Sequence, residues 1–144
     1  MRALGVDLGT VRIGLALTDP SRAIASPHDT LPAGDVAADD WPQQIAATLA
    51  DVAADVDADA IVIGLPRAMS GKDTAGAASA RKVADALRTA TDAAVHLWDE
   101  RLSSVEAERL LIGAGERRAR RRTARDRVAA AIILQSWLEA NATT

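Results

Sequence analysis

The chain has 144 residues, of which 49% are hydrophobic and 26% charged, and its formal net charge at pH 7 is −3. This composition is typical of a globular protein, and the length predicts a single domain over residues 1–144. The absence of cysteine excludes disulfides, thiol catalysis and cysteine-bound zinc, and no apolar run approaches the roughly 20 residues that span a bilayer.

Apolar periodicity predicts strands that alternate with helices after an initial hairpin. Residues 2–8 and 12–19 are short apolar runs around a Gly-Thr turn. Residues 23–32 indicate a third strand, at an edge of the sheet because Pro27 lacks a backbone donor. The later elements are expected to be a loop (33–40), a helix (41–56), a strand (60–66), a helix (73–91), a strand (93–100) and two helices (103–115 and 124–140). This order predicts an α/β fold, in which a mixed five-stranded sheet (a β-meander, then parallel strands) is flanked by helices.

Charge is distributed unevenly along the chain. Residues 1–100 hold 8 basic and 15 acidic residues, whereas residues 101–144 hold 9 basic and 5 acidic ones. Seven of those nine lie in "RRARRRTARDR", residues 117–127. Such a cluster indicates contact with a polyanion, and its common alternative is a solvated charged surface. The candidates for nucleic-acid binding are Arg117, Arg118, Arg120, Arg121, Arg122 and Arg125.

Three carboxylates stand out against this pattern of elements. Asp7 lies in the middle of the first apolar run, where an unpaired charge costs several kcal/mol. Glu100 ends the last predicted strand, with Asp99 beside it as a reserve candidate. Asp126 follows Thr123 by three residues at the expected start of the last helix. If the first and last parallel strands are neighbours, Asp7 and Glu100 face one cleft and Asp126 lies over it.

Three carboxylates in one site repel one another, and a divalent cation relieves that repulsion. Hard oxygen ligands select magnesium or manganese over zinc. Two such ions roughly 4 Å apart would hold the attacking and leaving oxygens of a phosphodiester during in-line hydrolysis. We therefore expect Asp7, Glu100 and Asp126 to be catalytic residues and ligands of Mg²⁺ or Mn²⁺.

Each carboxylate also has a structural interpretation. Asp7 could be a hydrogen-bonded core aspartate, and Asp99 or Glu100 could be a solvated residue at the end of a strand. Thr123 and Asp126 could form a capping box that opens the last helix.

Other polar features carry weaker signals. Ser103 and Glu106 form a second capping box, which we interpret as structural. The polar loop 67–76 could touch a substrate backbone, although a plain connection is the simpler interpretation. His28 and His96 belong to no metal-ligand spacing, so both are expected to be structural or solvated.

Four sequence blocks resemble a known family. In order, they are "GVDLGTVRIGLALTD", "IVIGLPRAMSG", "WDERLSSVEAE" and "RDRVAAAIILQSWLE", which reach from residue 5 to residue 139. They resemble the blocks of the bacterial YqgF/RuvX family, which has a ribonuclease H-like fold similar to Holliday junction resolvases. The resemblance implies a metal-dependent nuclease that completes the 5′ end of 16S ribosomal RNA. It also implies that Asp7, Glu100 and Asp126 take the family's acidic positions. Arg125 departs from the lysine expected there and cannot donate a proton as lysine can.

Other functions stay open from the sequence. An older assignment of the family is junction resolution in DNA, which makes DNA junctions a second class of substrate. "DLGT" (7–10) also resembles the first phosphate loop of actin-like ATPases, but those proteins close two such domains around a nucleotide. A non-catalytic RNA-binding assembly factor is a further alternative. We expect a cytoplasmic monomer or weak dimer with a structured RNA partner and no membrane partner, since Asp7 interrupts any secretory signal.

Overall fold

The computed structural model describes residues 1–66, 74–102 and 121–141, and for residues 101 and 121–126 it describes the backbone alone. The strands are β1 (Arg2–Leu8), β2 (Arg12–Thr18), β3 (Ala25–Pro32), β4 (Ala58–Leu65) and β5 (Ala94–Asp99). The helices described are α1 (Trp41–Asp55), α2 (Ala75–Ala90), the 3-10 turn η1 (Glu100–Leu102) and α4 (Arg121–Asn141). Within these residues, no helix is long and apolar enough to cross a membrane.

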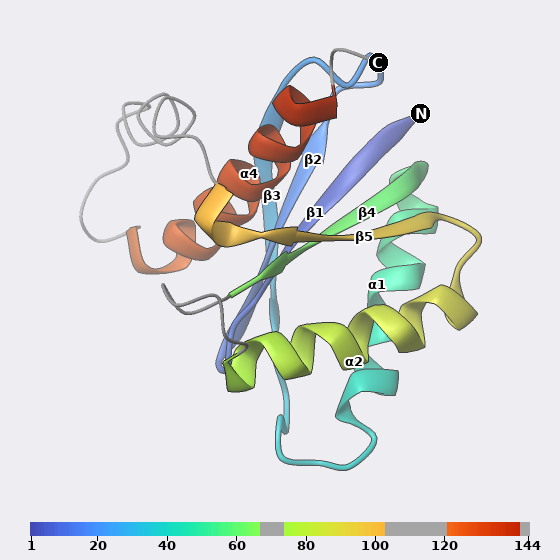
Figure 1. The fold of residues 1–144 in the computed structure, drawn as a ribbon, viewed down its shortest axis with the longest axis vertical. Coiled ribbons are helices and arrows are strands. Elements are labelled where there is room, and N and C mark those ends of the chain that lie inside the picture. Colours follow the sequence, from blue (N-terminus) through green and yellow to red (C-terminus); the bar gives the residue numbers. More distant parts are fainter. Residues whose placement is uncertain (67–73, 103–120, 142–144) are drawn as a thin grey trace.

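The five strands form one mixed sheet in the order β3-β2-β1-β4-β5. β1 pairs antiparallel with β2, β2 antiparallel with β3, and β4 lies parallel to both β1 and β5. The predicted meander followed by parallel strands is confirmed. Helices α1 and α2 cover one face and α4 covers the other, as Figure 1 shows.

Alternation along the strands gives the two faces different side chains. Leu4 and Val6 of β1, with Ile61 and Ile63 of β4, pack under α1 and α2. On the α4 face the same strands carry smaller residues, which are Ala3 and Gly5 on β1 and Ala60 and Val62 on β4. Large side chains therefore fill the space beneath α1 and α2, whereas α4 lies close to the sheet.

Gly5 permits this close approach of α4. A Cβ at Gly5 would lie 2.8 Å from the Cβ of Leu134 and 2.9 Å from the carbonyl oxygen of Ala130. Both contacts are shorter than real Cβ atoms tolerate, and one of them is with the helix backbone. Gly5 therefore lets α4 cross close to β1 at Ala130 and Leu134, one helical turn beyond Asp126.

Local sequence accounts for the ends of several elements. In the β1–β2 turn, a Cβ at Gly9 would collide with the carbonyl oxygen of Arg12, so the turn requires glycine. β3 is an edge strand as predicted, and its register shifts opposite Leu15 and Ala16, where Pro27 removes a donor. Thr74 caps α2 by accepting a hydrogen bond from the backbone N–H of Ala77 at 3.1 Å.

Two expectations are wrong. The first and last parallel strands are not neighbours, because β4 lies between β1 and β5. The last helix begins by Arg121 rather than at residue 124. Thr123 is therefore a helical residue, and the Thr123–Asp126 capping box is excluded because a capping residue must precede the first helical one. Arginine is a good helix former, which accounts for helix at Arg121 and Arg122, before the predicted start.

Some expectations fall on residues outside the described ranges. These are the helix 103–115 with its Ser103–Glu106 capping box, and most of the loop 67–76. The structure describes both histidines. His28 is exposed on β3, and His96 stacks against Trp137 with ring centroids 5.2 Å apart. Burial, followed by the charges of Arg22 and Arg88, lowers the pKa of His96.

Candidate active site

Asp7 lies near the carboxyl end of β1 with its side chain on the α4 face, by the same alternation that turns Gly5 toward α4. Its pairing partner on the neighbouring strand β2 is Gly14. On the other side, Gly64 is the next residue of β4 beyond the last β1–β4 pair. Neither neighbour has a side chain, so the two flanking strands leave room beside the carboxylate for groups from other elements.

Glu100 reaches the same place from β5, across the intervening strand. It is the first residue of η1, directly after β5, and its side chain folds back over β4. Its Oε1 atom lies 2.8 Å from where a Cβ of Gly64 would stand. Its carboxyl group is hydrogen-bonded to that of Asp7. The sheet order separates β1 from β5, and the missing side chain at position 64 lets the two acids meet.

The electrostatics of the pair follow from this contact. Burial, then the charge of Asp7, the hydrogen bond with Asp7 and the charge of Asp99, in that order, together raise the pKa of Glu100 from 4.5 to about 7. Glu100 is therefore protonated below neutral pH and donates to the Asp7 carboxylate. When two carboxyl groups share a proton, a divalent cation can replace that proton and bind both groups.

This raised pKa predicts how the metal-free protein responds to pH. The folded state holds its Glu100 proton up to about pH 7, whereas the unfolded chain loses it near 4.5. The folded state binds more protons within that window, so the free energy of unfolding should fall as pH rises through it. Thermal melting in EDTA should show the decline in the native protein, and Glu100→Gln should remove this component. Equal pH dependence in the two proteins would contradict the raised pKa.

Asp99 lies on the opposite face from the pair. It is the last residue of β5, paired with Leu65, and alternation places it with Leu97, which packs against the core beneath α1 and α2. Geometry therefore favours Glu100 over Asp99 as the partner of Asp7. Asp99 acts on the pair through its charge.

The third predicted acid, Asp126, lies in the first part of α4, and its side chain is outside the description. Its backbone is one turn before Ala130, which contacts β1 at Gly5. Arg121, Arg122 and Arg125 lie on the same helical segment, again with backbone alone described. Arg117, Arg118 and Arg120 fall outside the described ranges. Arg127 is half-buried, and its Nε atom has no hydrogen-bond acceptor among the described residues.

Sequence reasoning missed Gly64 as a site residue. It lies inside "IVIGLP", where the apolar run predicts a buried strand. A glycine inside such a strand is itself a signal, because it marks a place where another group approaches closely. That group is the carboxylate of Glu100.

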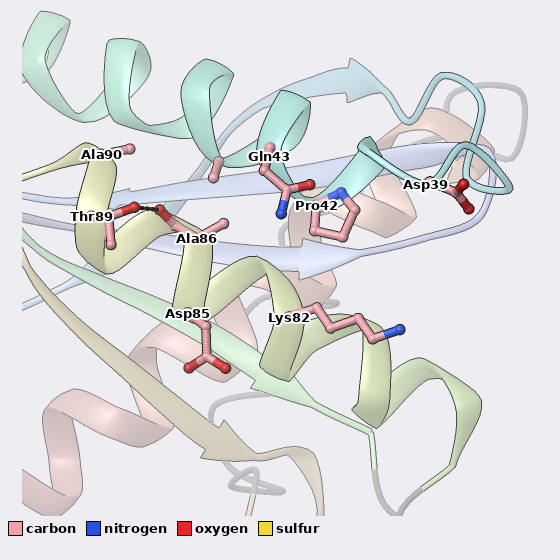
Figure 2. A pocket seen from close by; sticks show the side chains of 9 residues that line it. Asp39, Pro42, Gln43, Lys82, Asp85, Ala86, Thr89 and Ala90 are labelled. Carbon is pink, nitrogen blue, oxygen red and sulfur yellow. Dashed lines mark hydrogen bonds between the residues drawn. The ribbon is translucent and has the colours of Figure 1, made fainter.

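The larger of two surface grooves in the described part of the chain lies away from the acidic pair, between α1 and α2. It encloses about 640 Å³ and is lined by residues that include Asp39, Gln43, Lys82 and Asp85. Figure 2 shows these side chains spread along the groove rather than converging on one point. Asp85 is paired with Arg88 at 3.0 Å on its own helix. The groove is on the opposite face of the sheet from Asp7 and Glu100, so size alone does not locate the site.

The chemistry of the acidic pair fits a divalent cation. Both are carboxylates, the ligands that magnesium and manganese prefer. After burial, the negative charge of Asp7 is the next largest cause of the raised pKa of Glu100, so a cation that neutralises the pair would relieve their repulsion. Among the residues that the structure describes, no three or more acidic or histidine residues are grouped so that they could hold a metal ion. Asp126 is not among them, because its side chain is not described.

The strand order, with acids near the end of β1 and after β5, defines a ribonuclease H-like fold of the RuvC type. The structure is similar to RuvC of Thermus thermophilus, with a TM-score of 0.61 and 15% identity over 100% of this chain and 98% of that one. It is also similar to the fowlpox virus Holliday junction resolvase, with a TM-score of 0.57 and 10% identity over 97% and 99% of the two chains.

Sequence comparison gives the family. Residues 1–140 match the family described as "RuvX: Holliday junction resolvase". A Myxococcus xanthus protein named "Putative pre-16S rRNA nuclease" is 43% identical over 98% of this chain and 89% of its own length. A Pelotomaculum thermopropionicum protein of the same name is 40% identical over 96% and 87%. The chain belongs to the RuvX family.

Proposed function

We propose that this protein is a metal-dependent nuclease that hydrolyses phosphodiester bonds in the 5′-end maturation of pre-16S ribosomal RNA. The names of its relatives support the substrate. The observation that carries the reaction is the pair of hydrogen-bonded carboxyl groups of Asp7 and Glu100 over Gly64. Residues 1–144 act as a single nuclease domain in the cytoplasm, where the RNA is made.

Asp7 and Glu100 would hold Mg²⁺ or Mn²⁺ after Glu100 releases the proton that it shares with Asp7. A bound cation supplies charge neutralisation and Lewis-acid activation to phosphodiester hydrolysis. The rigid strand β1 fixes Asp7, and Gly64 leaves room for Glu100. Asp126, carried by α4, would complete the ligand set or orient the attacking water.

The arginines at the start of α4 and just before it would bind the phosphate backbone of the RNA. Each arginine that neutralises a phosphate on a single strand contributes about −0.7 to the slope of log affinity against log salt. Changing Arg120, Arg121 and Arg122 to alanine should therefore weaken RNA binding and flatten the slope by up to about 2 units. Cleavage of saturating RNA should fall much less than affinity does, because the carboxylates are untouched.

A double variant of α2, Lys82→Ala with Arg88→Ala, is the control for loss of positive charge, because α2 covers the opposite face of the sheet. It should leave the slope unchanged. Salt titrations of RNA binding by fluorescence anisotropy measure both slopes. If the arginine variant keeps the native slope, these arginines only solvate the helix and the RNA follows another path.

The experiment that tests the proposed function is sequencing of 16S ribosomal RNA ends in cells depleted of the protein. Unprocessed 5′ ends should accumulate and disappear when the native gene is restored. Purified protein with Mg²⁺ or Mn²⁺ should then trim the same precursor. Normal 5′ ends in depleted cells would contradict the proposal.

Junction resolution in DNA is the second candidate, favoured by the family's description and by the fold shared with RuvC. A resolvase must cut two strands symmetrically and therefore needs two sites related by a two-fold axis. A single cut at an RNA end needs only one, so we expect a monomer, or a dimer whose activity does not depend on dimerisation. Paired symmetric nicks in a synthetic four-way junction, faster than cleavage of RNA, would favour the resolvase.

A further inference from the structure

A buried serine on α4 connects the helix to the segment that carries Glu100. Ser136 is 4% exposed. Its hydroxyl accepts a hydrogen bond from Trp98 Nε1 at 3.1 Å and donates one to the carbonyl oxygen of Leu102 at 2.6 Å. Trp98 is two residues before Glu100 and Leu102 is two residues after it. One side chain therefore anchors the chain on both sides of Glu100.

The turn that carries Glu100 needs such an anchor. η1 has only three residues, so its own hydrogen bonding fixes little of its orientation. Leu102 is 58% exposed, so packing in the core does not hold it in place. The hydrogen bond that its carbonyl oxygen accepts from Ser136 therefore links the end of the turn directly to a packed helix.

The helix on which Ser136 lies is itself fixed against the sheet near the carboxylates. Leu134 and the carbonyl oxygen of Ala130 contact β1 at Gly5, and Ile133 packs over Gly64 beside Glu100. Trp137, the residue after Ser136, packs its ring against that of His96 of β5. A movement of η1 relative to α4 would therefore be a movement of Glu100 relative to Asp7.

A serine in the middle of a helix ordinarily bonds back to its own helix. Ser136 instead bonds to two groups from outside the helix, 38 and 34 residues away in the chain. A buried hydroxyl without partners costs free energy, and an alanine would fill the same place without that cost. What the hydroxyl adds to the core is therefore the connection it makes.

We propose that Ser136 is a positioning residue of the carboxylate site, which sets the placement of Glu100 beside Asp7 by tying η1 to α4. The role of the site rests on the nuclease function proposed above. The link itself is a property of the fold. Loss of an outer-shell hydrogen bond to a metal ligand costs about 10- to 100-fold in affinity or activity, and the bond from Ser136 acts on the turn that holds the ligand.

The test is Ser136→Ala, compared with Thr18→Val as a matched control. Thr18 is also buried and accepts a hydrogen bond, from the backbone N–H of Ala3 at 2.9 Å. It lies at the end of β2, beside the start of β1 and therefore at the opposite end of that strand from Asp7. Both variants remove one buried hydroxyl. Only Ser136→Ala should lower kcat for RNA cleavage, by about 10-fold, with KM for RNA unchanged.

Binding of Mn²⁺ alone, followed by calorimetry, is the readout that needs no RNA. It should weaken about 10-fold in Ser136→Ala and stay native in Thr18→Val. Ser136→Thr, which keeps the hydroxyl, should restore both kcat and Mn²⁺ affinity toward native values. The indole N–H resonance of Trp98 should shift in Ser136→Ala, as expected for loss of its acceptor.

The outcomes separate the two proposals. If the native protein binds Mn²⁺ but cuts no RNA, the proposed function fails and the Mn²⁺ affinities still decide the role of Ser136. If Ser136→Ala loses stability like Thr18→Val but keeps native kcat and Mn²⁺ affinity, Ser136 is structural and the positioning proposal is overturned.

Discussion

Asp7→Asn is expected to lower RNA hydrolysis at saturating Mg²⁺ by at least about 100-fold while the protein stays folded. Perturbing groups that merely support a metal ligand already costs about 10- to 100-fold, and this change removes a ligand charge itself. The amide keeps the shape of the side chain, and it removes the negative charge that, after burial, contributes most to the raised pKa of Glu100. The metal-free variant should therefore be no less stable than the native protein.

The measurement is a single-turnover cleavage assay on the RNA precursor, with circular dichroism to verify folding. Asp85→Asn is the matched control, because Asp85 is a surface aspartate of α2 with a side chain 77% exposed. It should retain native activity. Native turnover in Asp7→Asn, with contaminating nuclease excluded by a second purification, would remove Asp7 from the reaction.

Gly64→Ala is expected to lower cleavage by roughly 100-fold, because displacement of a reacting group by about 1 Å can cost that much. The added Cβ would lie 2.8 Å from Oε1 of Glu100 and 2.5 Å from Cδ1 of Ile133. Both are side-chain ends, so the protein can accommodate the methyl group by moving them. That accommodation takes Glu100 away from Asp7.

Gly5→Ala provides the comparison for this variant. Its Cβ would meet the backbone of α4 instead of a carboxylate, so it should destabilise the fold by about 1–3 kcal/mol. Chemical denaturation and cleavage rates of the two variants should therefore separate, with Gly5→Ala losing more stability and Gly64→Ala more activity per folded molecule. If the two variants lose activity and stability in the same proportion, Gly64 does not act through Glu100.

The strands and their faces follow closely from the sequence. The apolar runs are short and bounded by glycine, proline or charge, so their positions depend on local chemistry. The structure has β1 at Arg2–Leu8, where it was predicted, and α2 at Ala75–Ala90, close to the predicted range 73–91. Asp7 is recognisable because a charge inside such a run needs a partner.

The spatial order of the strands does not follow from such local patterns. Pairing of β4 between β1 and β5 depends on how the helical connections cross the sheet, and both orders have the same apolar periodicity. The prediction that β1 and β5 are neighbours failed for this reason. Gly64 signals a close approach, but the group that approaches it, and the role of Ser136, could not be assigned before that order was known, since each acts on a residue from another element.

The start of α4 shows a different limit. The Thr123–Asp126 spacing matches a capping box, yet Thr123 is a helical residue because the helix begins by Arg121. A capping signal is weak where the residues before it are themselves good helix formers, as the arginines here are.

The central claim is that Asp7 and Glu100 together bind the catalytic cation. Anomalous X-ray diffraction from crystals grown with Mn²⁺ tests it most directly, because the scattering locates manganese independently of any assay. We expect a peak within bonding distance of carboxylate oxygens of both residues, absent in crystals of Asp7→Asn. Saturated crystals of an active preparation with no manganese at this pair, or with manganese bound only elsewhere, would contradict the account.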